Sequence, residues 1–240
     1  MDSKRLLGRL ALVTGASRGI GEAVARRFAA EGAHVVALGR TVGALEELDD
    51  TIRAAGGTAS LVTLDLRDFD KIDQLGAALY QRFGKLDVLA GNAGVLGTLS
   101  PTGHIMPKTW GEVMDVNLTA NWRLIRSLDP LLRRSESGRV VFTTCAAARA
   151  AEPYWGAYAA SKAALETMAR IYASEVAATN VKVNLVDPGI VRTKLRLQGF
   201  PGEERSRLAA PDEVTDLFVT LAAADCPHHG ETLRRRKNGD

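Results

Sequence analysis

The chain has 240 residues, a formal net charge of +3, 46% hydrophobic residues and 25% charged residues. These are ordinary proportions for a globular protein, and they exclude a disordered, collagen-like or disulfide-stapled chain. No apolar run approaches the roughly 20 residues of a membrane helix, and residues 1–5 lead into no secretory segment. Cys145 and Cys226 match no metal-ligand spacing and fit a reducing compartment. We therefore expect a cytoplasmic protein that binds neither membrane nor nucleic acid, with the basic run at 234–237 as a solvated tail.

In the first half of the chain, short apolar runs alternate with helical patterns. Runs without polar alternation are typical of strands covered on both faces, and strand–helix–strand order implies right-handed parallel crossovers. The pattern predicts an α/β protein with a Rossmann-like doubly wound parallel sheet and helices on both faces. The predicted strands are residues 10–13, 34–38, 59–64 and 87–90, and the predicted helices are residues 20–30, 42–55 and 70–83.

The second half continues the alternation with longer helices, and no linker or internal repeat divides it. We therefore predict a single domain over residues 1–240. The predicted elements are helices at 109–134 and 158–177, strands at 139–144 and 181–186, and a helix start at Pro211.

Three long segments each follow a predicted strand, so they emerge at the carboxyl edge of the sheet, where such sheets bind ligands. They are residues 92–108, 145–156 and 187–210, and the last is the expected substrate loop. Tyr154, Trp155 and residues 195–200 lie on these loops, where they indicate either an apolar pocket or ordinary packing.

A glycine-rich turn joins the first strand to the first helix. Gly15 permits a tight turn, Gly19 lets a pyrophosphate approach the backbone, and Gly21 lets the helix pack closely on the strand. The N-terminus of the helix offers free N–H groups to an anion. The spacing is Gly-x3-Gly-x-Gly and not the Gly-x-Gly-x2-Gly of most dinucleotide folds. The turn therefore indicates a nucleotide site, with a purely structural turn as the alternative.

With Thr14 and Ile20 included, this turn resembles the cofactor signature of the short-chain dehydrogenase/reductase (SDR) family. Further motifs follow in the family's order: Asn92-Ala93-Gly94, Asn117, Tyr158-x3-Lys162 and Pro188-Gly189. The resemblance covers roughly residues 8–225 and is to the single-domain branch. It implies hydride transfer between nicotinamide and a carbonyl or alcohol substrate. The cofactor-binding residues that it implies are Gly15, Ser17, Arg18, Gly19, Ile20, Gly21, Arg40, Asp65, Leu66, Asn92, Ala93, Gly94, Tyr158, Lys162, Pro188, Gly189, Ile190 and Thr193.

The end of the second strand favours NADP over NAD. An NAD site places an acidic residue there, whereas this chain has Gly39 and Arg40. Gly39 leaves room, and the planar guanidinium of Arg40 suits a 2′-phosphate, which Ser17 and Arg18 can also approach. Asp65 and Leu66 resemble the family's adenine-contacting pair, although Asp65 also suits a helix cap.

Tyr158 and Lys162 are four residues apart and share one helix face. A phenol has a pKa of about 10, and a neighbouring ammonium lowers it. The resemblance implies that Tyr158 exchanges a proton with the carbonyl oxygen and that Lys162 also holds the nicotinamide ribose. It assigns Asn117 to anchoring a water that links the lysine to solvent.

The sequence departs from the family thirteen residues before Tyr158, where Cys145 replaces a serine that hydrogen-bonds the reacting carbonyl. A thiol is a weaker donor, and losing an oxyanion donor costs about 10²–10³-fold in rate. Thr144 compensates only if its side chain turns inward, although adjacent strand residues face opposite ways. Catalysis that is impaired or adapted to the thiol is one reading, and an NADP-binding module without turnover is the other. The Asn-Ala-Gly and Tyr-x3-Lys motifs argue against another doubly wound nucleotide enzyme such as a methyltransferase.

The helices at 109–134 and 158–177 resemble the pair through which family members dimerise. Their long apolar stripes predict a homodimer or homotetramer. His228 and His229 have no third ligand at a suitable spacing, so we predict an exposed loop and no metal site. Residues 230–233 start a final strand, but residues 234–237 are basic where the resembled family has an apolar, glycine-rich ending.

Overall fold

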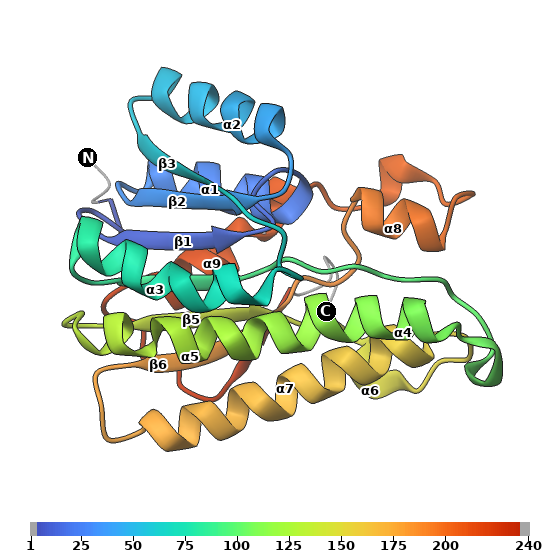
Figure 1. Cartoon of the computed structure of the whole chain (residues 1–240). Coiled ribbons are helices and arrows are strands. Elements are labelled where there is room, and N and C mark those ends of the chain that lie inside the picture. Colours follow the sequence, from blue (N-terminus) through green and yellow to red (C-terminus); the bar gives the residue numbers. More distant parts are fainter. Residues whose placement is uncertain (1–3, 236–240) are drawn as a thin grey trace.

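The computed structural model describes residues 4–235, which form a seven-stranded sheet flanked by helices (Figure 1). The elements in chain order are β1 (Leu10–Thr14), α1 (Gly19–Ala30), β2 (His34–Gly39), α2 (Val42–Ala54), β3 (Thr58–Thr63), α3 (Phe69–Phe83), β4 (Val88–Gly91), η1 (Thr102–His104), α4 (Pro107–Met114), η2 (Asp115–Thr119), α5 (Ala120–Arg133), β5 (Arg139–Thr143), α6 (Ala147–Ala150), α7 (Gly156–Val176), β6 (Lys182–Asp187), α8 (Lys194–Gly199), η3 (Arg205–Arg207), η4 (Pro211–Val214), α9 (Thr215–Ala222) and β7 (Thr232–Arg234).

The strands pair in the order β3-β2-β1-β4-β5-β6-β7, and every pair is parallel. The chain therefore runs outward from β1 to one edge, returns to β4 and then runs to the other edge. The direction changes between β1 and β4, which defines the switch point of the sheet. The predicted doubly wound α/β fold is confirmed.

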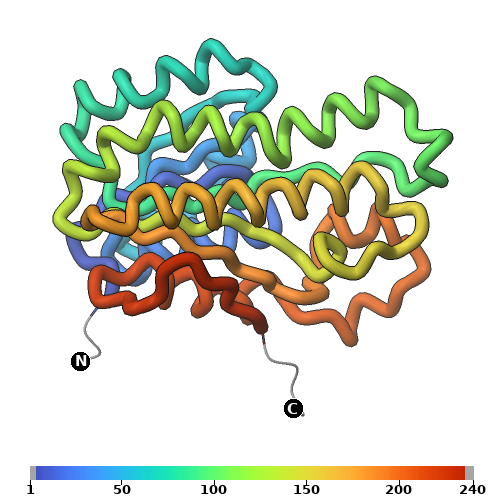
Figure 2. Tube along the Cα trace, turned by 90° about the horizontal axis from the view of Figure 1, so that it is seen from below, coloured from blue at the N-terminus to red at the C-terminus, as the bar shows by residue number. Residues whose placement is uncertain are grey.

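Two helical layers cover the sheet. Helices α3, α5 and α7 lie side by side on one face, as Figure 2 shows in teal, green and gold, while α1, α2 and α9 cover the other. Phe142 of β5 is fully buried under the first layer, and Phe28 of α1 and Phe218 of α9 are fully buried in the second. The two layers bury the central strands on both sides, which explains why their sequences lack polar alternation.

The edge strand β3 is less buried than the central strands. Thr58 and Thr63 at its ends are exposed, and Ser60 is its one buried residue. Val62 still packs against one layer, and Ala59 and Leu61 pack against the other, so β3 is covered on both faces. Its partial exposure arises because an edge strand has a neighbouring strand on one side only.

The predicted helix at 109–134 is continuous but differs in detail. It begins at Pro107, whose missing N–H costs nothing in the first turn, and a π-helical segment at Asp115–Thr119 separates α4 from α5. The second long helix begins at Gly156, before Tyr158. Two of the predicted long loops contain short helices, α6 and α8.

The predicted final strand forms. Thr232–Arg234 pairs with the end of β6, so the strand includes the first residue of the basic run. Arg235 donates to Glu213 at 3.0 Å, so it is paired and not simply solvated. Arg236 and Lys237 lie outside the described residues.

The two histidines that follow α9 have structural contacts. His228 bonds Glu231 at 2.8 Å, and the ring of His229 lies between the carbonyl of Ala173, at 2.9 Å, and the N–H of Val183, at 3.3 Å. The prediction of an exposed loop is wrong for His229, because the ring closes a gap between α7 and β6. In the part of the chain that the structure describes, no group of three or more His, Cys, Asp or Glu side chains is placed to hold a metal.

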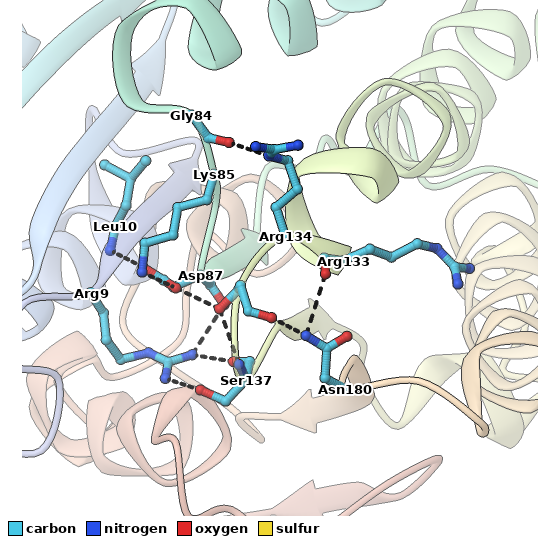
Figure 3. A network of polar contacts seen from close by, with 10 residues as sticks. Arg9, Leu10, Gly84, Lys85, Asp87, Arg133, Arg134, Ser137 and Asn180 are labelled. Carbon is cyan, nitrogen blue, oxygen red and sulfur yellow. Dashed lines mark hydrogen bonds and ion pairs between the residues drawn. The ribbon is translucent and has the colours of Figure 1, made fainter.

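Asp87 is a buried carboxylate at the amino edge of the sheet (Figure 3). It accepts hydrogen bonds from the N–H of Leu10 at 2.8 Å, the hydroxyl of Ser135 at 2.5 Å and the ammonium of Lys85 at 3.0 Å. Burial alone raises the pKa of Asp87, but these bonds outweigh it and hold the pKa below its usual value. The carboxylate thus stays charged and joins β1, β4 and the end of α5.

Arg9 completes this network with backbone and side-chain bonds. Its guanidinium donates to the hydroxyl and carbonyl of Ser137, at 2.7 and 2.6 Å, and to the carbonyl of Asp87 at 3.1 Å (Figure 3). Asn180 reaches the same region by donating to the carbonyl of Ser135. The amino edge is therefore closed by polar contacts.

Among residues 4–235, no helix is both long and apolar enough to cross a membrane.

Candidate active site

A cavity of about 700 Å³ lies at the carboxyl edge of the sheet. It is lined by the glycine-rich turn, the ends of β2 to β6 and the loop that carries α8. Gly21 and Asn117 are the predicted site residues that do not line it. The predicted residues that do line it are Gly15, Ser17, Arg18, Gly19, Ile20, Arg40, Asp65, Leu66, Asn92, Ala93, Gly94, Cys145, Tyr158, Lys162, Pro188, Gly189, Ile190 and Thr193.

Thr14 joins the two strands at the switch point. Its fully buried hydroxyl accepts hydrogen bonds from the N–H groups of Asn92 and Ala93, each at 3.0 Å. The side-chain amide of Asn92 donates back to the carbonyl of Thr14 at 3.3 Å. These bonds hold the turn after β1 against the Asn-Ala-Gly segment after β4.

The glycines of the turn are required by backbone conformation and close packing. Gly15 and Gly19 have φ angles of +66° and +61°, in the left-handed region that favours glycine. A Cβ on Gly21 would lie 2.2 Å from the carbonyl oxygen of Gly15, so Gly21 seats α1 behind the turn and away from the cavity. Arg18 precedes α1 without a side-chain cap, which leaves N–H groups available at the cavity. These features fit a bound phosphate or pyrophosphate.

The ends of β2 and β3 bring charged groups to one side of the cavity. Arg40 lies 3.8 Å from Asp65, which Arg67 binds at 2.7 Å. Hydrogen bonding from Arg67 lowers the pKa of Asp65 to about 2. The helix-cap alternative for Asp65 is wrong, because Asp68 precedes α3 and accepts from the N–H of Lys71. Arg67 was not predicted, because its only signal in the sequence is its position two residues after Asp65.

Tyr158 and Lys162 lie at the opposite end, and both are buried, with 9% and 3% of their surface exposed. The Lys162 ammonium donates to the carbonyl of Thr143 at 2.8 Å and lies 5.8 Å from the centre of the Tyr158 ring. Burial raises the pKa of Tyr158 well above its usual value, and Cys145 raises it further. The prediction of a lowered pKa is therefore wrong for the chain alone, because burial of the phenol and the neighbouring thiol determine the direction of the shift. Burial also lowers the pKa of Lys162.

Cys145 is half-buried and lines the cavity beside Tyr158. Its neighbour Thr144 turns its hydroxyl the other way, where it donates to Glu166 at 2.8 Å. Thr144 therefore does not compensate for the missing serine, as the alternation of side chains along a strand predicts. The Cys145 thiol is therefore the side chain that occupies the position of the family's serine.

Asn117 is fully buried in the π-helical segment and contacts the loop after β4. Its amide oxygen accepts from the N–H of Val95 at 2.8 Å, and its nitrogen donates to the carbonyl of Val95 at 2.9 Å and to Ser161 at 3.0 Å. The side chain is thus held by three bonds to protein groups, and the water-anchoring role that the resemblance implies stays a prediction. It ties the segment after Gly94 to α7.

A buried ionic cluster behind the cavity was missed by the sequence analysis. Glu166 is 3% exposed and binds Arg149, Thr144 and Arg170, the last at 2.9 Å. Arg149 also donates to Asp187 at 2.6 Å. Burial raises the pKa of Glu166, but the bonds from Thr144 and the arginines outweigh it and lower the pKa below its usual value.

This cluster, Glu166–Arg149–Asp187, positions three walls of the cavity. Arg149 lies in α6, which follows Cys145. Glu166 lies one turn beyond Lys162, and Asp187 accepts from the N–H of Gly189 at 3.2 Å. One signal was present in the sequence, since Glu166 is a carboxylate on a helix face otherwise rich in alanine and leucine. Its partners are distant in sequence and could not be inferred.

The comparisons with known proteins agree with this geometry. The short chain dehydrogenase family model matches residues 9–203, so the chain belongs to the short-chain dehydrogenase family. An uncharacterised oxidoreductase of Escherichia coli (strain K12), YciK, is 36% identical over 234 residues, which are 96% of this chain and 89% of the relative.

Two similar crystal structures contain a nicotinamide cofactor. A short-chain dehydrogenase from Escherichia coli CFT073, complexed with NADPH, is 36% identical with a TM-score of 0.92 over 96% of this chain and 98% of the other. One from Shigella flexneri 2a, complexed with NADP, is 34% identical with a TM-score of 0.93 over 97% and 99%.

Proposed function

We propose that this chain is an NADP-dependent oxidoreductase that interconverts a carbonyl compound and its alcohol. The observation that carries the proposal is the placement of Tyr158 and Lys162. Both are buried at the floor of the same cavity that the glycine-rich turn lines at its other end. Family membership supports the same reaction class. We also propose that the chain acts as a single domain in the cytoplasm, with residues 187–210 as the substrate loop.

When bound, a nicotinamide would supply or accept the hydride. Because its pKa is raised, Tyr158 holds its proton at neutral pH and suits the role of proton donor to a carbonyl oxygen. Lys162, fixed by the carbonyl of Thr143, is placed to hold a ribose hydroxyl and to replace the proton. The Cys145 thiol polarises the same carbonyl oxygen, with a weaker hydrogen bond than a serine would make.

NADP is favoured over NAD by the charge at the end of β2. Arg40 is half exposed, and its contact with Asp65, at 3.8 Å, is too long for a hydrogen bond, so the guanidinium is available to a 2′-phosphate. The NADPH- and NADP-bound relatives support this choice.

A second candidate function is cofactor binding without turnover, and the observation that favours it is Cys145. Thr144 also lines the cavity, but its hydroxyl donates to Glu166 and does not replace the carbonyl-binding hydroxyl of the family. Both functions require NADP binding, and only the first requires the Tyr158 hydroxyl. The variants below separate them.

Replacing Tyr158 with phenylalanine removes the proton donor and retains the ring. We expect Tyr158→Phe to reduce carbonyl reduction by about 10²–10⁴-fold with little change in NADPH affinity. The measurement is the loss of reduced-nicotinamide absorbance over a panel of carbonyl compounds. Tyr80→Phe, on the outer face of α3, is the matched control and retains activity. Equal activity in Tyr158→Phe and wild type would exclude the proposed mechanism.

Cys145→Ser restores the shorter donor with little steric change. We expect reduction of a reactive aldehyde to become about tenfold faster, because one oxyanion donor accounts for about 10²–10³-fold and the thiol supplies part of it. Cys226→Ser, which changes a buried cysteine outside the cavity, leaves the rate unchanged. A rate in Cys145→Ser no higher than in wild type means that the site is adapted to the thiol.

Arg40→Asp tests the cofactor preference. The aspartate repels a 2′-phosphate and suits ribose hydroxyls, so we expect NADP to bind about tenfold more weakly or worse, since a charged hydrogen bond contributes about 1.5–3 kcal/mol. Titration of both oxidised cofactors measures the change. Arg53→Asp, in α2 outside the cavity, makes the same charge change and preserves the preference. Wild-type protein that binds NAD as tightly as NADP contradicts this assignment.

We propose that α4, α5 and α7 form the contact of a homodimer or homotetramer. Three large apolar side chains on these helices are exposed: Trp110, Trp122 and Ile171, at 41%, 47% and 54%. We expect a mass above that of one chain at micromolar concentration and a lower mass for Trp122→Glu than for the control Tyr80→Glu. Light scattering measures both. A monomeric mass for the wild-type protein excludes the contact.

A further inference from the structure

Beyond the predicted cofactor residues, the cavity continues between α6 and α8, which extend past the carboxyl edge of the sheet (Figure 1). We call this part the outer pocket. Its apolar lining consists of Ala146, Ala147, Ala150, Trp155, Leu195 and Phe200. Tyr158 and Cys145 lie where the outer pocket meets the cofactor half, so a substrate that reacts there places the rest of its structure among these apolar groups.

One wall of the outer pocket is aromatic and leads directly to Tyr158. The ring centre of Trp155 lies 5.8 Å from that of Tyr158 and 5.9 Å from that of Phe200. Both distances fall in the range of stacked aromatic pairs. Trp155 and Phe200 are half-buried, so each ring retains surface that a ligand can cover.

The cation on this wall is already neutralised. The guanidinium of Arg196 lies 3.6 Å from the ring centre of Phe200, and Glu203 binds it with two bonds at 2.6 and 2.8 Å. Arg196 itself lines the cavity, but it is paired with Glu203 and packed on the Phe200 ring, so it does not offer a free charge to an anionic substrate.

The alanines in and just before α6 leave space in the outer pocket. Ala146, Ala147 and Ala150 contribute only methyl groups to the lining. A bulky group attached to the carbonyl carbon thus finds aromatic surface on one side and room on the other. Two further lining residues, Glu152 and Lys194, are charged but exposed, so water solvates them and they do not dominate the buried part of the pocket.

We propose that the substrate carries an aryl or similarly flat apolar group next to its carbonyl, and that this group packs against Trp155 and Phe200. The proposal rests on the proposed function for the position of the carbonyl. Polyhydroxylated and carboxylated carbonyl compounds are disfavoured, because the outer pocket would strip water from their polar groups without replacing the hydrogen bonds.

The test separates binding from turnover. Binding is measured by calorimetry with acetanilide, an aryl amide that is not reduced, in the presence of NADP. Turnover is measured with acetophenone, benzaldehyde, dihydroxyacetone and pyruvate under NADPH. We expect acetanilide to bind, and kcat/KM to be at least about tenfold higher for the aryl compounds than for the other two.

Two opposite substitutions probe the pocket itself. Phe200→Ala removes a wall and Ala150→Leu fills the space, and we expect each to lower aryl kcat/KM and acetanilide affinity by about tenfold, with NADPH affinity unchanged. Tyr154→Ala removes a nearby aromatic side chain that does not line the cavity, and it serves as the matched control. Thermal unfolding of all variants verifies that they are folded.

The outcomes distinguish this proposal from the proposed function. Acetanilide binding that is lost in both pocket variants supports the apolar pocket, even if no carbonyl compound is reduced. Faster turnover of dihydroxyacetone or pyruvate than of acetophenone and benzaldehyde overturns it and leaves the oxidoreductase function intact. Failure of acetanilide to bind to the wild-type protein also overturns it, as does an acetanilide affinity in both Phe200→Ala and Ala150→Leu that equals the wild-type affinity.

Discussion

The hydroxyl of Thr14 is the contact on which the geometry of the cavity depends. It is buried between the two strands at which the sheet reverses direction, and it binds two consecutive backbone N–H groups after β4. Without this acceptor, the N–H of Ala93 would lose its partner and the N–H of Asn92 would keep only the carbonyl of Ala90, at 3.1 Å. Gly15 accommodates the resulting closeness, because its Cβ would lie 3.0 Å from the Cα of Ala93. A cavity that spans both strands follows from this contact.

The amino edge of the sheet holds a structural polar network, and the carboxyl edge holds the candidate active site. At the amino edge, the Asp87 carboxylate and the two terminal nitrogens of Arg9 bind neighbouring strands and turns, and the Nε of Arg9 is buried without a partner, so little polar surface is left for a ligand. At the carboxyl edge, the turn before α1 leaves backbone donors unbound, and Tyr158 and Cys145 face a cavity. The polar groups at the amino edge of the sheet therefore bind one another, whereas those at the carboxyl edge remain available to a ligand.

Sequence reasoning located what depends on local spacing. The glycine-rich turn, the Tyr158–Lys162 pair and the alternation of strands and helices each follow from residues within a few positions of one another, and the structure places them as predicted. The orientation of Asn117 and the cluster of Glu166, Arg149 and Asp187 depend on contacts between distant segments. The pKa of Tyr158 also escaped prediction, because its direction depends on burial, which no motif records.

The Glu166–Arg149–Asp187 cluster also limits how the rim of the cavity can fluctuate. One guanidinium is shared between the helix that carries Lys162 and the strand end that precedes Pro188. Displacement of α6 therefore strains both attachments at once. A shift at any one of these three residues is transmitted to the helix that carries Tyr158 and Lys162 and to the segment that carries Pro188 and Gly189.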